Sequence, residues 1–215
     1  MFIQPWDAAL DDTEWQSWID DGHDFGLLAA NGLLGRAPIV VPTHFTVDRA
    51  SLLIHLARPN PIWKTIEVDP NVTFTVTSDY AFIPGPWRAN PETSAIHGVP
   101  TSYYAAVQFT CQAAIIDEPE AKAELLRRQM AHFQPEGDHA PICPDTPPYG
   151  AMLSGIRGLQ LEIIEVQAKF KYDDHKPVEQ RTNIAQRLTE RDTGLDTRTA
   201  AQQLRRLDLI GSWEP

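Results

Sequence analysis

The 215-residue sequence is poor in cysteine, in basic residues and in long apolar runs. Its two cysteines, Cys111 and Cys143, argue against a disulfide-rich secreted protein, and Cys111 is interpreted as a buried free thiol within a strand. No run of about 18 apolar residues exists, so no transmembrane helix is expected. The N-terminus, MFIQPWDAALDD, lacks a basic region, which argues against a signal peptide and favours a cytoplasmic protein.

Basic residues are outnumbered, since 18 Lys and Arg against 29 Asp and Glu give a net charge of −11. A DNA duplex repels such a chain unless basic residues gather in one patch. The densest basic pairs, Arg127-Arg128 and Arg205-Arg206, lie on expected helices with acidic neighbours, which is typical of solvated faces. Direct nucleic-acid binding is therefore disfavoured.

Apolar periodicity predicts a mainly β chain with peripheral helices, an α+β fold class. Strands are expected as a hairpin within 25–41 and at 51–57, 72–78, 99–116 and 159–172. Helices are expected at 119–134, 149–155, 178–191 and 197–208, after a first helix capped by Asp12 or Thr13 with Trp15, Trp18 and Ile19 facing inward. In the last strand the apolar phase switches at Ile163-Ile164, which predicts a β-bulge.

The segment LLIHLARPNPIWKTI, residues 52–66, ends an apolar strand in polar donors and then begins a short helix. Arg58, Asn60 and Lys64 next to a helix N-terminus are typical of an anion site, because the first backbone N–H groups of a helix are unsatisfied. Asn60 is a favoured N-cap, and Pro61 suits the first turn. The alternative stays open that Asn60 only caps the helix while Arg58 and Lys64 are solvated.

Two further segments carry candidate ligands for an anion. In GVPTSYYAAV, residues 98–107, the adjacent hydroxyls of Thr101 and Ser102 follow a proline, although an ordinary strand entry explains them equally well. In the last strand Lys169 and Lys171 share one face, where lysines also serve to protect a sheet edge. The spacing of His132, His139 and Cys143 matches no structural zinc pattern, so no metal site is predicted.

These segments, in this order, resemble the PaiB family of FMN-binding split-barrel proteins. The corresponding stretches are HLARPNPIW (55–63), VPTSYYAAV (99–107) and AKFK (168–171), supported by the MFIQPWDA start, AFIPGPW and IRGLQLEI. The resemblance covers about residues 1–190. It implies a six-stranded antiparallel FMN-binding split β-barrel related to pyridoxamine-phosphate oxidase, formed by residues 1–175. Residues 176–215 would be a helical extension packed on the barrel or on the partner of a homodimer.

The resemblance also implies which residues bind FMN. Arg58, Asn60 and Lys64 would lie near the phosphate, and Thr43 and His44 near the isoalloxazine ring. The full set of implied cofactor-binding residues is Thr43, His44, His55, Ala57, Arg58, Asn60, Trp63, Lys64, Thr101, Ser102, Tyr103, Lys169 and Lys171. No catalytic residue can be assigned from the sequence.

The sequence departs from the family pattern in three places, one of which is Gly85-Pro86-Trp87-Arg88 in place of the family's Ser-Trp-Tyr type segment. Asp173-Asp174-His175 replaces Ser-Gln-Asn and adds negative charge near the expected anion, and Tyr103 stands where asparagine is usual. Three functions follow from the sequence. The first is an FMN-dependent oxidoreductase acting on a small molecule. The second is a PaiB-type regulatory or ligand-sensing protein that does not contact DNA directly. The third is a split barrel that binds haem or another aromatic ligand in place of FMN.

Overall fold

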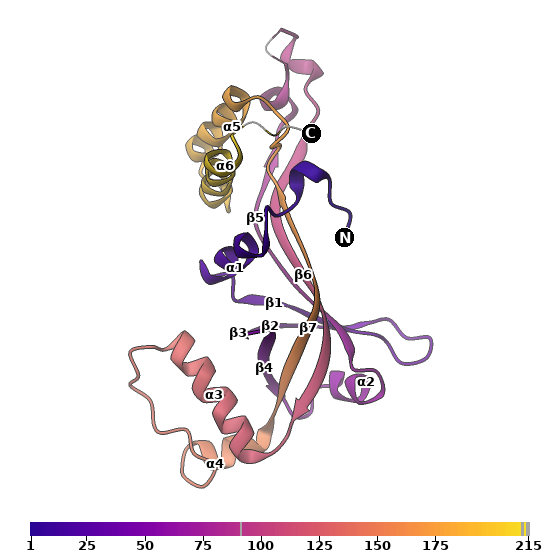
Figure 1. Cartoon of the computed structure of the whole chain (residues 1–215), viewed down its shortest axis with the longest axis vertical. Helices are drawn as coiled ribbons and strands as arrows, with labels where there is room; N and C mark the ends of the chain where they lie inside the picture. Colours follow the sequence, from indigo (N-terminus) through magenta and orange to yellow (C-terminus); the bar gives the residue numbers. More distant parts are fainter. Residues whose placement is uncertain (91, 212, 214–215) are drawn as a thin grey trace. The chain divides into compact units, whose positions relative to one another are not determined.

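The computed structural model describes residues 1–90, 92–211 and 213, and its largest feature is one β-sheet (Figure 1). The strand order is β2-β1-β5-β6-β7-β4-β3. The strands are β1 (Phe25–Ala30), β2 (Ile39–His44), β3 (Thr46–Asp48), β4 (Ser51–Ala57), β5 (Asn71–Ile83), β6 (Thr101–Ile116) and β7 (Ile156–Lys171). β1 pairs antiparallel with β2 and β5, and β4 pairs antiparallel with β3 and β7.

The predicted mainly β, α+β class is confirmed, but the prediction of six strands is wrong. The described residues form seven strands, and the one that was missed is β3. β3 has three residues, and an alternating pattern cannot be recognised over so short a stretch. It reverses into β4 through Arg49, whose φ of 56° lies in the left-handed region that tight turns use.

Helices flank the strands along the chain. They are α1 (Asp12–Asp20), α2 (Ile62–Val68), α3 (Pro119–Phe133), α4 (Tyr149–Met152), α5 (Val178–Arg191) and α6 (Asp196–Ile210), with 3-10 turns at Pro5–Asp7, Gly85–Arg88, Ala95–His97 and Leu153–Gly155. No helix in the described part of the chain is long and apolar enough to cross a membrane. The four long helices, α1, α3, α5 and α6, fall within a few residues of their predicted positions.

Two helix starts differ from expectation. α1 is capped by Asp11, whose Oδ1 accepts from the N–H groups of Thr13 (2.8 Å) and Glu14 (3.2 Å), so the prediction of Asp12 or Thr13 was displaced by one residue. At α2 the N-cap position belongs to Pro61, and Asn60 stands one residue earlier, where its side-chain oxygen accepts from Ile62 N–H at 3.1 Å. Asn60 still satisfies one free donor of that helix.

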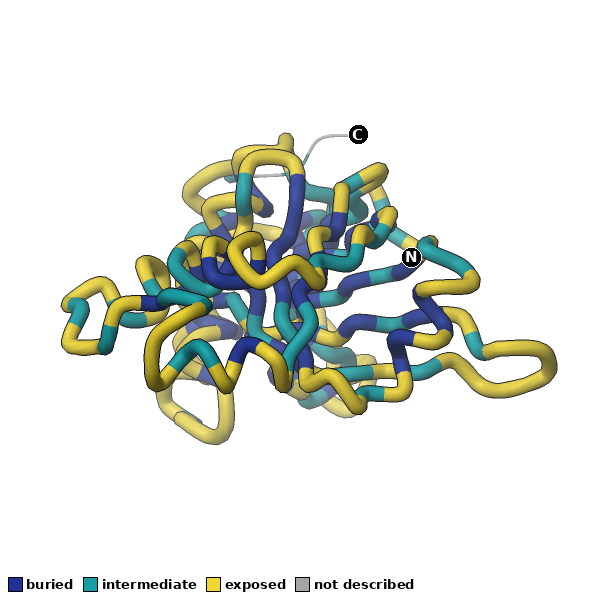
Figure 2. The backbone as a smooth tube through the Cα atoms, turned by 90° about the horizontal axis from the view of Figure 1, so that it is seen from below, coloured by how far each residue is buried: buried dark blue, intermediate teal, exposed yellow. Residues whose placement is uncertain are grey.

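The chain divides into two compact units. Unit 1 comprises residues 1–18, 77–107 and 167–215, and unit 2 comprises residues 19–76 and 108–166. β5, β6 and β7 each contribute residues to both units. In unit 2 the core includes Leu28, Ile54 and the edge-to-face pair Phe45 and Phe74, all fully buried, whose ring centroids lie 4.8 Å apart. Buried segments are dark blue in Figure 2.

The apolar phase switch predicted for β7 coincides with its passage from one unit to the other. In unit 2 the buried apolar side chains are Leu159 and Leu161, whereas in unit 1 they are Ala168, Phe170 and Tyr172. Ile164, between the two sets, is 64% exposed. Buried apolar side chains therefore stand at odd positions in one unit and at even positions in the other, and the predicted bulge at Ile163-Ile164 stays a prediction.

A buried ionic network fastens the C-terminal helices within unit 1. Asp174 accepts from Arg181 of α5 at 2.6 Å and from Arg206 of α6 at 2.6 Å, and all three side chains are at most 1% exposed. Arg206 also pairs with Glu14 of α1 at 2.7 Å. The interpretation of Arg205-Arg206 as a solvated face is thus wrong for Arg206, because its charge is paired in the interior. α5 and α6 lie side by side (Figure 1).

Candidate functional site

The predicted cofactor-binding residues fall into two groups, one in each unit. Thr43, His44, His55, Ala57, Arg58, Asn60, Trp63 and Lys64 belong to unit 2, and Thr101, Ser102, Tyr103, Lys169 and Lys171 belong to unit 1. Each group is described by itself.

In unit 2 the predicted phosphate ligands are engaged with the protein. Arg58 pairs with Asp117 at 2.6 Å and donates from Nε to the Ser154 carbonyl at 2.7 Å. Asn60 caps α2, which has only seven residues, and Lys64 is exposed on that helix. The Arg58–Asp117 pair holds the pKa of Asp117 below its usual value, chiefly through the hydrogen bond from Arg58. The Arg58 guanidinium is therefore already neutralised by a carboxylate.

Trp63 and Ala57 form the local frame of that segment. The Trp63 indole is buried and donates to the Ala57 carbonyl at 2.9 Å, while the Arg157 guanidinium lies 5.1 Å above its ring. This bond closes the turn between β4 and α2. Trp63 accordingly has a structural role that explains its position without a cofactor.

A histidine pair occupies another part of unit 2. The rings of His44 and His55 lie 5.1 Å apart, and Phe133 packs 5.0 Å from His44. His55 Nδ1 bonds Gln129 Oε1 at 2.6 Å, which orients the ring. Burial, with a smaller contribution from His55, lowers the pKa of His44, so its imidazole is neutral at pH 7. Thr43, next along β2, is buried and donates to the His44 carbonyl at 3.1 Å.

In unit 1 four predicted ligands meet. Lys171 donates from Nζ to Thr101 Oγ1 at 2.6 Å and to the Ser102 carbonyl at 2.8 Å. Lys169 lies on the same strand face and donates to the Phe2 carbonyl at 3.0 Å. The ring of Tyr104 is 5.6 Å from Lys169 Nζ and 5.9 Å from Lys171 Nζ. We call the side chains of Thr101, Ser102, Tyr104, Lys169 and Lys171, with Asp7, the lysine cluster.

The lysine cluster carries an excess of positive charge. Its one carboxylate, Asp7, lies 3.8 Å from Lys169. Each ammonium group has three N–H donors, and the Lys171 bonds use two of them, so a donor is left over for an oxyanion. Burial lowers the pKa of Lys171, with Asp173 and Asp7 acting in the opposite direction. Lys169 is buried and Lys171 is half-buried. These two cations, together with the Thr101 hydroxyl, therefore fit a phosphate group.

Tyr103 serves a different network from the lysine cluster. Its hydroxyl donates to Asp173 at 2.9 Å, and the same carboxylate accepts from Arg88 at 2.7 and 3.1 Å. Tyr103 is fully buried, and its pKa is raised by burial and by the charge of Asp173. Asp173 and Asp174 are each neutralised by arginine, so the negative charge expected beside the anion is compensated internally.

Sequence reasoning missed Asp7 as a member of the cluster. Asp7 is brought there by an antiparallel bridge between Ala8 and Lys169, which joins residues 161 positions apart. The only indication in the sequence that Asp7 belongs to the site was the MFIQPWDA start, which resembles the family's N-terminal motif. Burial raises the pKa of Asp7 from 3.8 to about 6, against the attraction of Lys169 and Lys171.

Asp7→Asn is expected to stabilise the protein at about pH 7.5 by roughly 1–3 kcal/mol. The folded state keeps the Asp7 proton up to about pH 6 whereas the unfolded state loses it near 3.8, so stability falls as the pH rises through that window. Asparagine is uncharged at every pH, so the variant has no ionised carboxylate in this buried position. Urea denaturation at about pH 7.5 and pH 4 measures this, and the gain should shrink at the lower pH. An equal gain in the free energy of unfolding at both pH values would contradict the raised pKa of Asp7.

Solved structures of similar fold include flavoproteins. The flavocytochrome Anf3 from Azotobacter vinelandii superimposes with a TM-score of 0.60 at 19% identity, covering 77% of this chain and 70% of that one. The FAD and heme binding protein from Mycobacterium smegmatis gives 0.57 at 16% identity, covering 76% and 73%. At such identities the likeness shows the fold, which is that of the split-barrel flavin proteins.

The sequence itself carries the family assignment. No curated protein matches it. The model of the family described as "Putative FMN-binding domain" matches residues 1–165, about three quarters of the chain. The chain belongs to this FMN-binding-domain family.

Proposed function

We propose that the protein binds FMN and is a flavin-dependent oxidoreductase acting on a small molecule. The observation that carries the proposal is the lysine cluster, which offers two cations, a hydroxyl and a left-over donor to a phosphate. Membership of the FMN-binding-domain family supports the choice of cofactor. When bound, FMN supplies one- and two-electron redox chemistry through its isoalloxazine ring.

The chain's own residues would bind and orient the cofactor. Lys169 and Lys171 would hold the phosphate charge, with Thr101 as an additional hydrogen-bonding partner. An alternative phosphate position lies wholly within unit 2, at Arg58, Asn60 and Lys64, and there Arg58 would first have to leave Asp117.

Purified protein titrated with FMN tests the proposal. Quenching of flavin fluorescence should saturate at one FMN per chain, and a nicotinamide cofactor should bleach the bound flavin's visible absorption. Protein that is colourless and leaves FMN fluorescence unchanged would refute the cofactor. Bound flavin that the nicotinamide cofactor does not bleach would refute the oxidoreductase while leaving the cofactor intact.

Haem is the second candidate, and the histidine pair of unit 2 favours it. A neutral imidazole is the form that ligates iron. Burial lowers the pKa of His44, and the ring of His55 lies 5.1 Å from the His44 ring. Adding hemin to the same preparation separates the candidates, because axial histidine ligation sharpens and shifts the Soret band. A shift lost in His44→Ala and His55→Ala, in protein that ignores FMN, would favour haem.

We further propose that the protein is a homodimer, because one face of the β1–β2 hairpin is apolar and exposed. Phe25 is 60%, Leu27 46% and Val40 52% exposed, and the register places Leu27 opposite the exposed Pro42. A second copy covering this face would bury it. Leu27→Lys should shift sedimentation from dimer to monomer, and a monomeric wild-type protein would contradict the proposal.

A further inference from the structure

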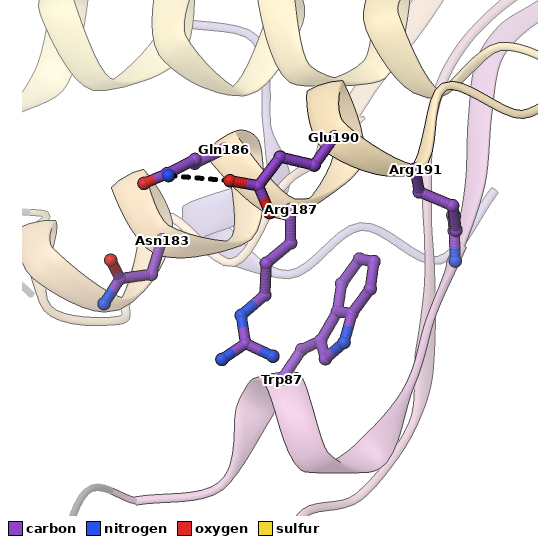
Figure 3. A pocket seen from close by; sticks show the side chains of 6 residues that line it. All are labelled: Trp87, Asn183, Gln186, Arg187, Glu190 and Arg191. Carbon is purple, nitrogen blue, oxygen red and sulfur yellow. Dashed lines mark hydrogen bonds between the residues drawn. The ribbon is translucent and has the colours of Figure 1, made fainter.

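Two adjoining hollows lie beside α5 in unit 1, and three residues line both of them: Trp87, Asn183 and Arg187. The first, of about 540 Å³, is also lined by Gln186, Glu190 and Arg191, and we call it the Trp87 hollow (Figure 3). The second, of about 210 Å³, has further walls from Pro86, Ala89, Pro177, Glu179 and Gln180, and we call it the Pro177 hollow. Neither belongs to the lysine cluster.

Arg187 is exposed on α5, contacts the face of Trp87 and has unused donors. Its guanidinium carbon lies 5.8 Å from the centre of the Trp87 ring, which is a cation–π contact. In the described part of the chain no carboxylate or carbonyl bonds this guanidinium, whereas the neighbouring Arg191 pairs with Asp196 at 2.6 Å. A planar guanidinium with free N–H groups is a receptor for a carboxylate or a phosphate.

Glu190 places a negative charge in the same hollow. It stands three residues after Arg187 on α5, so the two side chains share one side of the helix. Its Oε1 accepts from Gln186 at 2.8 Å, which leaves Oε2 for a ligand (Figure 3). A phosphate dianion on Arg187 would be repelled by Glu190, whereas a molecule with an ammonium group next to its carboxylate would satisfy both residues.

The Pro177 hollow supplies the aliphatic surface of the site. Pro86, Ala89 and Pro177 provide this surface next to Arg187, Glu179 and Gln180 form its polar rim, and the volume suits a short side chain rather than an aromatic cofactor. The hydrogen bond from Gln180 to the Arg88 carbonyl, at 2.9 Å, fixes α5 to the turn that carries Pro86 and Trp87. The walls of both hollows are thereby held together.

We propose that these hollows bind an α-amino acid with an aliphatic side chain. Arg187 takes the carboxylate, Glu190 takes the ammonium group, and the side chain enters the Pro177 hollow. The site is separate from the proposed flavin site and does not depend on it.

Calorimetric titration of the full-length protein with L-leucine, L-isoleucine, L-valine and L-alanine tests the proposal. Two probes remove one charge each from leucine: 4-methylpentanoate lacks the ammonium group and 3-methylbutylamine lacks the carboxylate. At least one amino acid should saturate below about 10 mM, and both truncated probes should bind at least 10-fold more weakly than leucine. Failure of all four amino acids, or equal binding of a truncated probe or of inorganic phosphate, would overturn the proposal.

Two variants locate the site. Arg187→Gln and Glu190→Gln should each weaken amino-acid binding at least 10-fold, with thermal unfolding and FMN titration as in the wild type. Arg128→Gln, an exposed arginine of α3, is the matched control and should bind normally. Arg187→Lys keeps the charge without the planar fork and should lie between wild type and Arg187→Gln. Unchanged binding in folded Arg187→Gln protein would place the ligand elsewhere and reject this site.

Discussion

Asp174→Ala is expected to lower the free energy of unfolding by about 3–5 kcal/mol, because it leaves Arg181 and Arg206 buried without their shared carboxylate. Burial raises the pKa of Asp174 while both arginines lower it, which reflects a carboxylate that the interior tolerates only through its partners. Since Arg181 belongs to α5 and Arg206 to α6, the loss should loosen the C-terminal helices first.

Urea denaturation followed by far-ultraviolet circular dichroism measures this change, and Asp208→Ala on the exposed side of α6 is the matched control. The control should stay within about 0.5 kcal/mol of the wild type. Asp174→Asn should be nearly as damaging as alanine, because an amide cannot compensate two guanidinium charges. If Asp174→Ala lowers the free energy of unfolding no more than Asp208→Ala does, the buried ionic network contributes nothing to stability.

Lys169→Met with Lys171→Met is expected to weaken FMN binding by 100-fold or more. Each lysine removed costs a charge-assisted contact with the phosphate, of roughly 1.5–3 kcal/mol. Methionine keeps the length and apolar stem of lysine, so the packing against Tyr104 is largely preserved. Flavin fluorescence titration of the double variant, and of each single variant, measures the loss.

Lys176→Met is the control for that pair, since Lys176 lies nearby in the chain but outside the lysine cluster. It should bind FMN as the wild type does. If the double variant still binds FMN within threefold of the wild type, with unchanged thermal unfolding, the lysine cluster does not bind the phosphate of FMN.

Local sequence patterns predicted the positions of the helices and strands well. They predicted poorly which charged side chains pair with one another. The 3.6-residue period of α3 and the proline at its start placed that helix within one residue, and an apolar run placed β4 at 51–57, where the structure has it. The free, buried Cys111 is also confirmed. These features depend on residues close together in the chain, which is why the sequence alone revealed them.

Long-range ion pairs were beyond such reasoning. Asp173 was expected to repel an anion, yet its charge is neutralised by Arg88, which stands 85 positions earlier. Arg206 was interpreted as solvated because its helix is charged, although it reaches Asp174 and Glu14 in the interior. Arg58 was expected at a phosphate, and its bond to Asp117 depends on a strand end and a loop 59 positions apart. No local pattern encodes these partners.

The dissociation constants of FMN for wild-type, Lys171→Met, Asp7→Asn and Arg58→Gln proteins test whether the lysine cluster binds the phosphate. We predict weaker binding for Lys171→Met by at least 10-fold, tighter binding for Asp7→Asn, which removes the one carboxylate of the cluster, and little change for Arg58→Gln. Normal binding by Lys171→Met together with a large loss in Arg58→Gln would contradict it and would place the phosphate in unit 2.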